Sequence, residues 1–175
     1  YSYYPYNINA GTSKIIDATL PKTQTAPFDS KADYMVSNAT SIKYDESNMP
    51  TINLTFSRHL FSILKFTITN TEETLKDEKL YGIKLQSASH TLSGSFSFDV
   101  RLGNESTAQF STDPLKTNKS VSVEYQSGQP TIGLGTNHTL YLVVPAGVYE
   151  SGDLSVQVYT ENEVFTQTIN KKITL

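Results

Sequence analysis

Apolar side chains recur at every second position through residues 51–69, the densest apolar stretch of this chain. The alternating residues are Ile52, Leu54 and Phe56 and, after an interruption at residues 57–61, Leu64, Phe66 and Ile68. A period of two is that of a β-strand, whose successive side chains point to opposite faces of a sheet. We therefore expect two half-buried strands joined by a short corner. Their polar faces would carry Asn53, Thr55, Lys65, Thr67 and Thr69.

The same alternation and its turn signals recur along most of the chain. Further strands are expected in residues 1–6, 80–85, 96–100, 121–125, 140–144, 154–160 and 164–175, with a hairpin turn at 161–163. The run LYLVV at 140–144 has the composition of a strand buried on both faces. Residues 34–36 form either a short strand or one helical turn, and 103–118 are expected as a loop. Residues 7–12 are expected as a turn-rich loop.

One short helix is expected after the central strands. Asn70 stands three residues before Glu73, which is capping-box spacing, and residues 75–80 would form the helix body. Some nine or ten strands with no long helical period indicate an all-β fold. We predict an antiparallel two-sheet β-sandwich of the transthyretin-like or Greek-key kind, with at most one short helix.

Composition limits the classes of protein that this chain can belong to. Its 175 residues predict a single domain, 1–175, and the absence of cysteine excludes disulfides, thiolate nucleophiles and cysteine-ligated zinc. A net charge of -3 gives no basic surface for nucleic acid. Charged residues are only 18%, and a surface of Ser, Thr and Asn instead suggests an exported protein. No apolar run reaches the length of a membrane helix, and the start at Tyr1 is interpreted as a trimmed mature form or a cloned boundary.

The residues that could carry chemistry do not combine into a site. His59, His90 and His138 lack metal-pair spacing, and His59 is interpreted as a buried or half-buried packing residue. An acidic cluster is interleaved with Lys76 and Lys79, which favours a solvated face over a calcium site; its members are Glu72, Glu73, Asp77 and Glu78. Two further acidic pairs, Asp29 with Asp33 and Asp45 with Glu46, are interpreted as solvated loop residues rather than a glycosidase pair.

Catalytic sequence motifs are also missing. No nucleophile elbow, phosphate loop or zinc-protease motif occurs, and Gly133-x-Gly135 is too short to weigh. We expect no catalytic, cofactor-binding or metal-binding residues, no cofactor and no enzymatic activity. Five N-x-S/T tripeptides begin at Asn38, Asn53, Asn104, Asn118 and Asn137 and are interpreted as chance matches. Tyr1, Tyr3 and Tyr4 would either pack in a sheet or form a sugar-stacking platform.

The order of several short motifs resembles the N-terminal domain of the fimbrillin family of Bacteroides-type bacteria. The motifs are Tyr3-Tyr4-Pro5-Tyr6, the LPKTQT segment at 20–25, Asp33-Tyr34-Met35, Leu54-Thr55-Phe56, Leu92-Ser93-Gly94 and the YLVVPAG strand at 141–147. Together they cover nearly the whole chain. Two features depart from the pattern: His59 follows Phe56 by three residues where the family often has two, and a second sandwich domain after the first is absent from these 175 residues.

The resemblance implies a precursor lipoprotein that is exported to the outer membrane and assembled into type V pili. It also implies that an extended strand of a neighbouring subunit fills a groove in the sandwich, which is recognition by strand addition. We therefore expect a structural or adhesive surface protein, a pilus subunit or a tip or anchor accessory, whose partners are other pilus subunits and surface glycans or proteins. The alternative from another class is a carbohydrate-binding sandwich module that uses loop or edge tyrosines.

Overall fold

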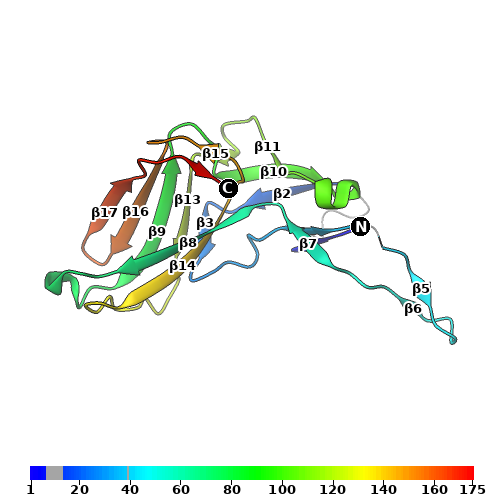
Figure 1. Ribbon diagram of the computed structural model, residues 1–175, viewed down its shortest axis with the longest axis horizontal. Helices are drawn as coiled ribbons and strands as arrows, with labels where there is room; N and C mark the ends of the chain where they lie inside the picture. The colour runs from blue at the N-terminus through cyan, green and yellow to red at the C-terminus, as the bar shows by residue number, and fades with distance from the viewer. Residues whose placement is uncertain (7–13, 39) are drawn as a thin grey trace.

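A computed structural model describes residues 1–6, 14–38 and 40–175 of the chain. Half of the chain is strand and only 5% is helix, so the expected all-β class with sandwich-like sheets is confirmed. Figure 1 shows the strands gathered into a layered body, with one hairpin extending away from it. Apolar residues at alternate positions account for much of this arrangement, because a strand with that pattern turns one face toward a core.

The largest sheet has five strands in the order β17 (Val164–Thr168), β16 (Leu154–Thr160), β9 (Leu80–Ser87), β13 (Ser120–Glu124) and β3 (Thr23–Thr25). All neighbours are antiparallel except β3, which runs parallel to β13. The hairpin predicted around residues 161–163 is confirmed, since β16 and β17 pair directly.

A two-stranded sheet packs against the large sheet. β8 (Ser62–Thr69) and β14 (Asn137–Val144) pair antiparallel over eight residues each. Leu140, Leu142 and Val144 of β14 are fully buried in the main core, together with Leu85 of β9 and Val123 of β13. The second half of the predicted central pair is therefore a strand, and the LYLVV run is buried as expected except at Tyr141, which is half-buried.

A second apolar cluster lies toward the other end of the molecule. Its sheets are β2 (Ile15–Leu20), β10 (Ser93–Asp99), β11 (Gln109–Phe110) and β12 (Thr117–Asn118), and the three-stranded β1 (Ser2–Tyr4), β4 (Met35–Ser37) and β7 (Phe56–His59). Tyr34, Phe61 and Phe96 meet edge to face there, with ring centroids 4.9 to 6.2 Å apart. The remaining strands form two small pairs, β5 (Lys43–Tyr44) with β6 (Pro50–Thr51) and β15 (Val148–Tyr149) with β18 (Ile173–Thr174).

The first half of the predicted central pair is wrong. Only Phe56 of its three alternating residues is in a strand, and β7 pairs with β4 instead of folding back at a corner onto β8. Ile52 and Leu54 are exposed in an extended segment, since alternation without a neighbouring strand specifies conformation but not burial.

The predicted short helix is a single 3₁₀ turn, η2 (Glu73–Leu75). Asn70 is buried and its amide donates to Ile132 O (2.8 Å), while its Oδ1 accepts from Glu72 N (2.8 Å). Asn70 is thus occupied in an Asx turn that joins two loops, and the expected capping box does not form.

Three further predictions concern short segments of the chain. Of the ambiguous residues 34–36, Met35 and Val36 belong to the strand β4, and Tyr34 directly precedes it. The predicted loop 103–118 contains part of a second 3₁₀ segment, η3 (Val100–Glu105), and the short strands β11 and β12. These short strands form because each pairs with β10, and this pairing cannot be predicted from the local sequence. The loop predicted at residues 7–12 lies outside the described residues.

Asp153, which directly precedes β16, is hydrogen-bonded to the end of β9 and the loop that follows it. Its carboxylate accepts from Ser87 Oγ (2.7 Å), from Ser89 N (3.0 Å) and Oγ (2.6 Å), and lies 3.0 Å from His90 Nδ1. Loss of solvent around Asp153 opposes ionisation, but the hydrogen bonds from Ser89, Ser87 and His90 outweigh it and lower its pKa to about 2. This contribution to stability is complete above the unfolded-state pKa near 4 and is lost as pH falls toward 2.

We expect Asp153→Asn to lower the free energy of unfolding by about 1–2 kcal/mol at pH 7, because the charge-assisted bonds weaken. The penalty should shrink between pH 4 and pH 2, since wild-type Asp153 becomes protonated there. Urea unfolding of both proteins across this range measures the difference. Exposed Asp77→Asn is the control and should change stability by less than about 0.5 kcal/mol. A pH-independent penalty would contradict the ionised state of Asp153.

Candidate functional site

One long strand, β8, has a hydrogen-bonding edge with no strand beside it among the described residues. In the ladder of β14 with β8, Tyr141 N donates to Pro27 O and Val143 N donates to Gln24 Oε1, so these groups point away from β8. Directly opposed residues of an antiparallel pair point the same way relative to the ladder. The outward groups of β8 therefore belong to Ile63, Lys65, Thr67 and Thr69. No other described strand pairs with this edge.

The apolar core is incompletely covered beneath this edge. Leu64, Phe66 and Ile68 point from β8 toward the main core but are only half-buried. Their partners on β14 are more deeply buried for the first two, since Leu142 and Leu140 are fully buried, while His138 opposite Ile68 is half-buried. Val156 and Val158 of β16 are half-buried against the same core. We use the name β8 groove for the half-buried row of β8 beside its open edge, together with the pocket that Ile68 shares with Val158. Its walls offer apolar side chains at strand spacing to a further strand.

A cavity of about 280 Å³ marks one end of the β8 groove. Ile68 lines it from β8, Val158 and Phe165 line it from β16 and β17, and Leu75 and Ile132 complete its largely apolar wall. A side chain of leucine or phenylalanine size fits this chemistry, since apolar pockets at alternate positions give strand addition its specificity.

The opposite edge of the same sheet is closed by a side chain. Gln24 is fully buried; its Nε2 donates to Val143 O (2.8 Å) and its Oε1 accepts from Val143 N (2.9 Å). The amide group carries one donor side and one acceptor side, so it replaces the backbone of a neighbouring strand. Tyr141 N is capped by Pro27 O (2.8 Å) in the same way. β8 is therefore the long edge of this sheet that is left open.

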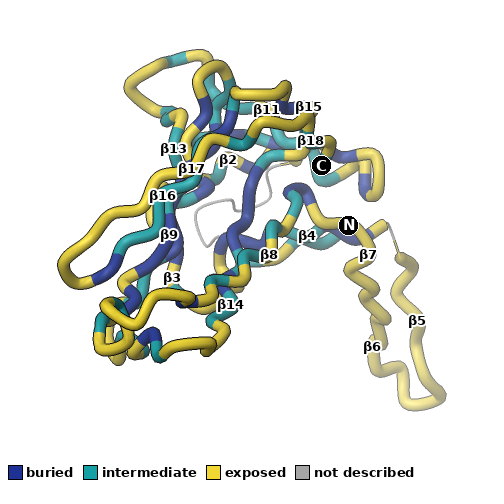
Figure 2. The backbone as a smooth tube through the Cα atoms, turned by 60° about the vertical axis from the view of Figure 1, so that its left-hand side comes forward, coloured by how far each residue is buried: buried dark blue, intermediate teal, exposed yellow. Residues whose placement is uncertain are grey.

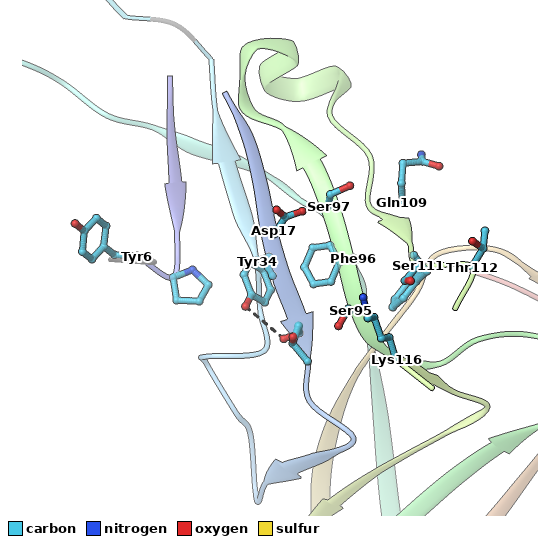
Figure 3. A pocket seen from close by; sticks show the side chains of 14 residues that line it. Tyr6, Asp17, Tyr34, Ser95, Phe96, Ser97, Gln109, Ser111, Thr112 and Lys116 are labelled. Atoms are coloured by element: carbon cyan, nitrogen blue, oxygen red, sulfur yellow. Dashed lines mark hydrogen bonds between the residues drawn. The ribbon is translucent and has the colours of Figure 1, made fainter. Parts of the chain in front are cut away.

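A second depression, of about 1010 Å³, lies over β2, β10 and β11. Figure 3 shows Ser95, Phe96 and Ser97 along β10, with Tyr34 and Tyr6 to one side and Gln109, Ser111 and Thr112 to the other. The Tyr34 hydroxyl donates to Thr19 O (3.4 Å), and burial raises its pKa. The mixture of aromatic rings with hydroxyl and amide groups is chemistry that a sugar can use.

The histidines are separated into local contacts. His59 is exposed rather than buried, contrary to the expectation, and its Nδ1 lies 2.7 Å from Asp33 Oδ1. It is exposed because β7 is an edge strand and not the predicted core corner. His90 contacts Asp153, and His138 Nε2 lies 3.3 Å from Thr136 Oγ1. Within residues 1–6, 14–38 and 40–175, no three metal-ligating side chains converge.

The acidic residues also have local partners. Asp29 accepts from the backbone N–H groups of Thr25 and Lys31, while Asp33 contacts His59, so the two acids do not face one another as a pair. Asp45 accepts from two backbone N–H groups at a hairpin tip. In the 72–79 segment, Glu73 pairs with Lys76 (2.6 Å), and Asn162 donates to Glu78 and lowers its pKa.

The N-terminal tyrosines do not share one environment. Tyr3 packs edge to face on Phe98 with centroids 5.8 Å apart, while Tyr1 and Tyr4 are exposed. This agrees with sheet packing for Tyr3 and gives no three-ring platform. Asn53 was interpreted as a mid-strand residue, but it is exposed in the extended segment after β6.

Comparison with known families now identifies what kind of protein has this open-edged fold. A family model described as fimbrillin-like matches residues 1–175, the entire chain. The chain belongs to the fimbrillin-like family. Membership confirms the resemblance in the sequence motifs and supports a function of the pilus-subunit type, at the cell surface and in association with other pilus subunits. No curated protein matches the chain at a significant level.

The fimbrillin-like family is structural rather than enzymatic. The described part of the chain contains no helix that is long and apolar enough to cross a membrane. For a structural subunit, the functional groups are those that contact a neighbour, and the outward N–H and C=O groups of β8 are the candidates for this role. Sequence reasoning found the β8 apolar row but missed Gln24, whose role depends on contact with a residue 119 positions away.

Proposed function

We propose that this fimbrillin-like protein is a subunit or a tip or anchor accessory of type V pili that assembles by donor-strand addition. The β8 groove would receive an extended strand of a neighbouring subunit. The observation that carries this proposal is the eight-residue edge of β8 above the half-buried row of Leu64, Phe66 and Ile68. Such an edge is a template for pairing with another chain.

The energetics of this mode are favourable. Each backbone hydrogen bond contributes about 1 kcal/mol net, and each apolar side chain that becomes fully buried contributes about 1.5–3 kcal/mol. A donor with three inward apolar residues would also complete the burial of Phe66 and its neighbours. Backbone pairing gives affinity, and the apolar row fixes register, since a one-residue slip would turn the donor's apolar face to solvent.

The wider assignment follows the family and is part of the same proposal. Residues 1–175 would form one fimbrillin-like N-terminal domain, made from a lipoprotein precursor and displayed on the outer membrane. Its adhesive role would involve host or bacterial surface glycans or proteins. We propose no catalytic residue, metal site or cofactor for it.

Thr67→Pro tests β8 as the acceptor edge. The Thr67 N–H points away from β14, so proline leaves the existing ladder intact but blocks a new strand. An eight-residue peptide of alternating valine and threonine, at one hundred times its Kd, should stabilise the wild type by about 2.7 kcal/mol. The melting temperature should then rise by about 5–10 °C in the wild type. The Thr67→Pro protein should show no rise.

Thr166→Pro is the matched control on a second exposed edge strand, β17. Thr166 N–H also points outward, because the neighbouring residues bond to β16. This variant should respond to the peptide as the wild type does. A peptide that stabilises none of the three proteins, or one that is blocked only by Thr166→Pro, would contradict strand addition at β8.

A carbohydrate-binding module is the second candidate function, and the depression in Figure 3 is the observation that favours it. Tyr34 offers an aromatic ring there, and Ser97 and Gln109 offer polar groups. A glycan array separates the two functions. A pilus shaft subunit should give no signal, whereas a binding module or an adhesive tip should select one class of sugar.

A further inference from the structure

Residues 40–55 form an exposed arm that extends from the body. Figure 1 shows the β5–β6 hairpin pointing away from the sheets, and Figure 2 shows it exposed along its length. The arm nevertheless carries five large apolar side chains with 43 to 63% of their surface exposed: Ile42, Tyr44, Met49, Ile52 and Leu54. Soluble proteins rarely expose so many apolar side chains together unless they meet a partner.

The tip of the arm has a defined structure. Asp45 Oδ1 accepts from Ser47 N (2.9 Å) and Met49 N (2.8 Å), and Asp45 N donates to Met49 O (3.1 Å). Asn48 adopts the positive φ of 61° that this turn needs. The hairpin is therefore closed by its own turn, while residues 52–55 continue as an extended segment without a backbone partner among the described residues.

The arm and the β8 groove are complementary. Ile52, Leu54 and Phe56 place an apolar side chain at every second position, as do Leu64, Phe66 and Ile68 of β8. The arm segment has a backbone and an apolar row to bury, and the groove lacks one strand. The arm therefore exposes an extended apolar strand, and the β8 groove has room for such a strand.

The two elements cannot meet within one molecule. Phe56 and Arg58 pair with β4, and Leu60 N donates to Tyr34 O (2.8 Å), so the chain between the arm and β8 is fixed to the second apolar cluster. The arm leaves this anchor in the direction away from the β8–β14 sheet (Figure 1). A second copy of the chain is therefore the occupant that the arm fits.

We propose that residues 51–56 of one copy pair with the open edge of β8 in a second copy, with Ile52 and Leu54 entering its groove. This inference rests on the proposed function and names the donor segment. The contact joins two different surfaces, so the copy that donates its arm keeps a free groove and the copy that accepts it keeps a free arm. A contact of this type repeats into an open filament unless its rotation closes a ring.

Sedimentation velocity of the whole chain tests the arm as donor. The wild type should associate with increasing concentration, and Ile52→Thr combined with Leu54→Thr should weaken association by at least about 100-fold, because two apolar side chains no longer enter the groove. Both residues are exposed, so the variant should fold normally. Asn53→Ser combined with Thr55→Ser changes only the other face of the segment and should associate as the wild type does.

Cross-linking tests the location of the contact. The chain has no cysteine, so Asn53→Cys in one copy and Thr67→Cys in another give one thiol each. A short bis-maleimide should join this mixture into heterodimers. A mixture of the Asn53→Cys and Thr166→Cys chains should give none.

The two proposals can fail separately. If the arm double variant associates like the wild type while Thr67→Pro prevents association, the arm proposal is overturned and strand addition at β8 stands. If the arm variant loses association while Thr67→Pro does not, the arm binds elsewhere and the proposal is also overturned. A wild type that stays monomeric at its highest soluble concentration overturns it as well.

Discussion

Replacing Gln24 with leucine is expected to lower the free energy of unfolding by about 4 kcal/mol, although the two side chains are similar in size. Leucine can neither accept from Val143 N nor donate to Val143 O, and both groups are buried by the surrounding core. A buried backbone group left without a partner costs about 1–3 kcal/mol, and this substitution leaves two. The midpoint of urea unfolding measures the loss, provided that the m-value is unchanged.

Gln167→Leu is the control for the change of side-chain type. Gln167 is exposed on β17, and its amide donates only to the adjacent Thr168 O (2.8 Å), so its loss should cost less than about 0.5 kcal/mol. A Gln24→Leu protein within 1 kcal/mol of the wild type would show that water or another group can satisfy Val143. The closed edge of β14 would then need a different explanation.

Gln24 also explains why the sheet is open on one side only. Its amide occupies the position of a third strand beside β14, and Pro27 O continues that substitute edge at Tyr141. The β8 edge has no such substitute among the described residues. Among the described residues, one edge is thus capped by a side chain and the other has no strand beside it, which is the arrangement that the proposed strand addition needs.

The alternation of apolar residues correctly predicted strands that form a hairpin with the next strand or that pack an apolar row against the core. β8, β14 and the β16–β17 hairpin were found this way, because period two combined with a turn or a continuous apolar run specifies them locally. The same period failed at Ile52 and Leu54. A donor segment meant for another molecule carries the same pattern as a core strand, so local sequence cannot separate the two.

The candidate site was harder to predict than the fold. The apolar row of Leu64, Phe66 and Ile68 is visible in the sequence, but an unpaired edge is defined by which strand is missing beside it. Gln24 lies in the LPKTQT motif, but its role was not predicted, since glutamine is usually a surface residue and its partner Val143 is distant in sequence. The burial of His59 was predicted wrongly for the same reason, because it depends on which strand pairs with β7.

Gly94→Ala is expected to be about as damaging as the loss of Gln24, with a fall of about 4 kcal/mol in the free energy of unfolding. Gly94 pairs with Leu20 of β2 on one side and Thr117 of β12 on the other. Its φ of 126° is a conformation that residues with a Cβ rarely adopt. A Cβ there would lie 2.3 Å from Lys116 O and 2.6 Å from Thr117 Cα, so backbone would have to move.

Differential scanning calorimetry of Gly94→Ala and Gly128→Ala separates the contact from the backbone strain. Gly128 also has a positive φ, 67°, but a Cβ there meets no atom within 4 Å, so alanine should cost only about 1–2 kcal/mol. At about 2–4 °C per kcal/mol, the melting temperature should fall by about 8–16 °C for Gly94→Ala and by about 2–8 °C for Gly128→Ala. Equal shifts in the two variants would mean that β12 does not approach β10 as closely as the structure has it. Since β10 carries Phe96 and Phe98 into the second apolar cluster, loosening it should also weaken the anchor from which the arm extends.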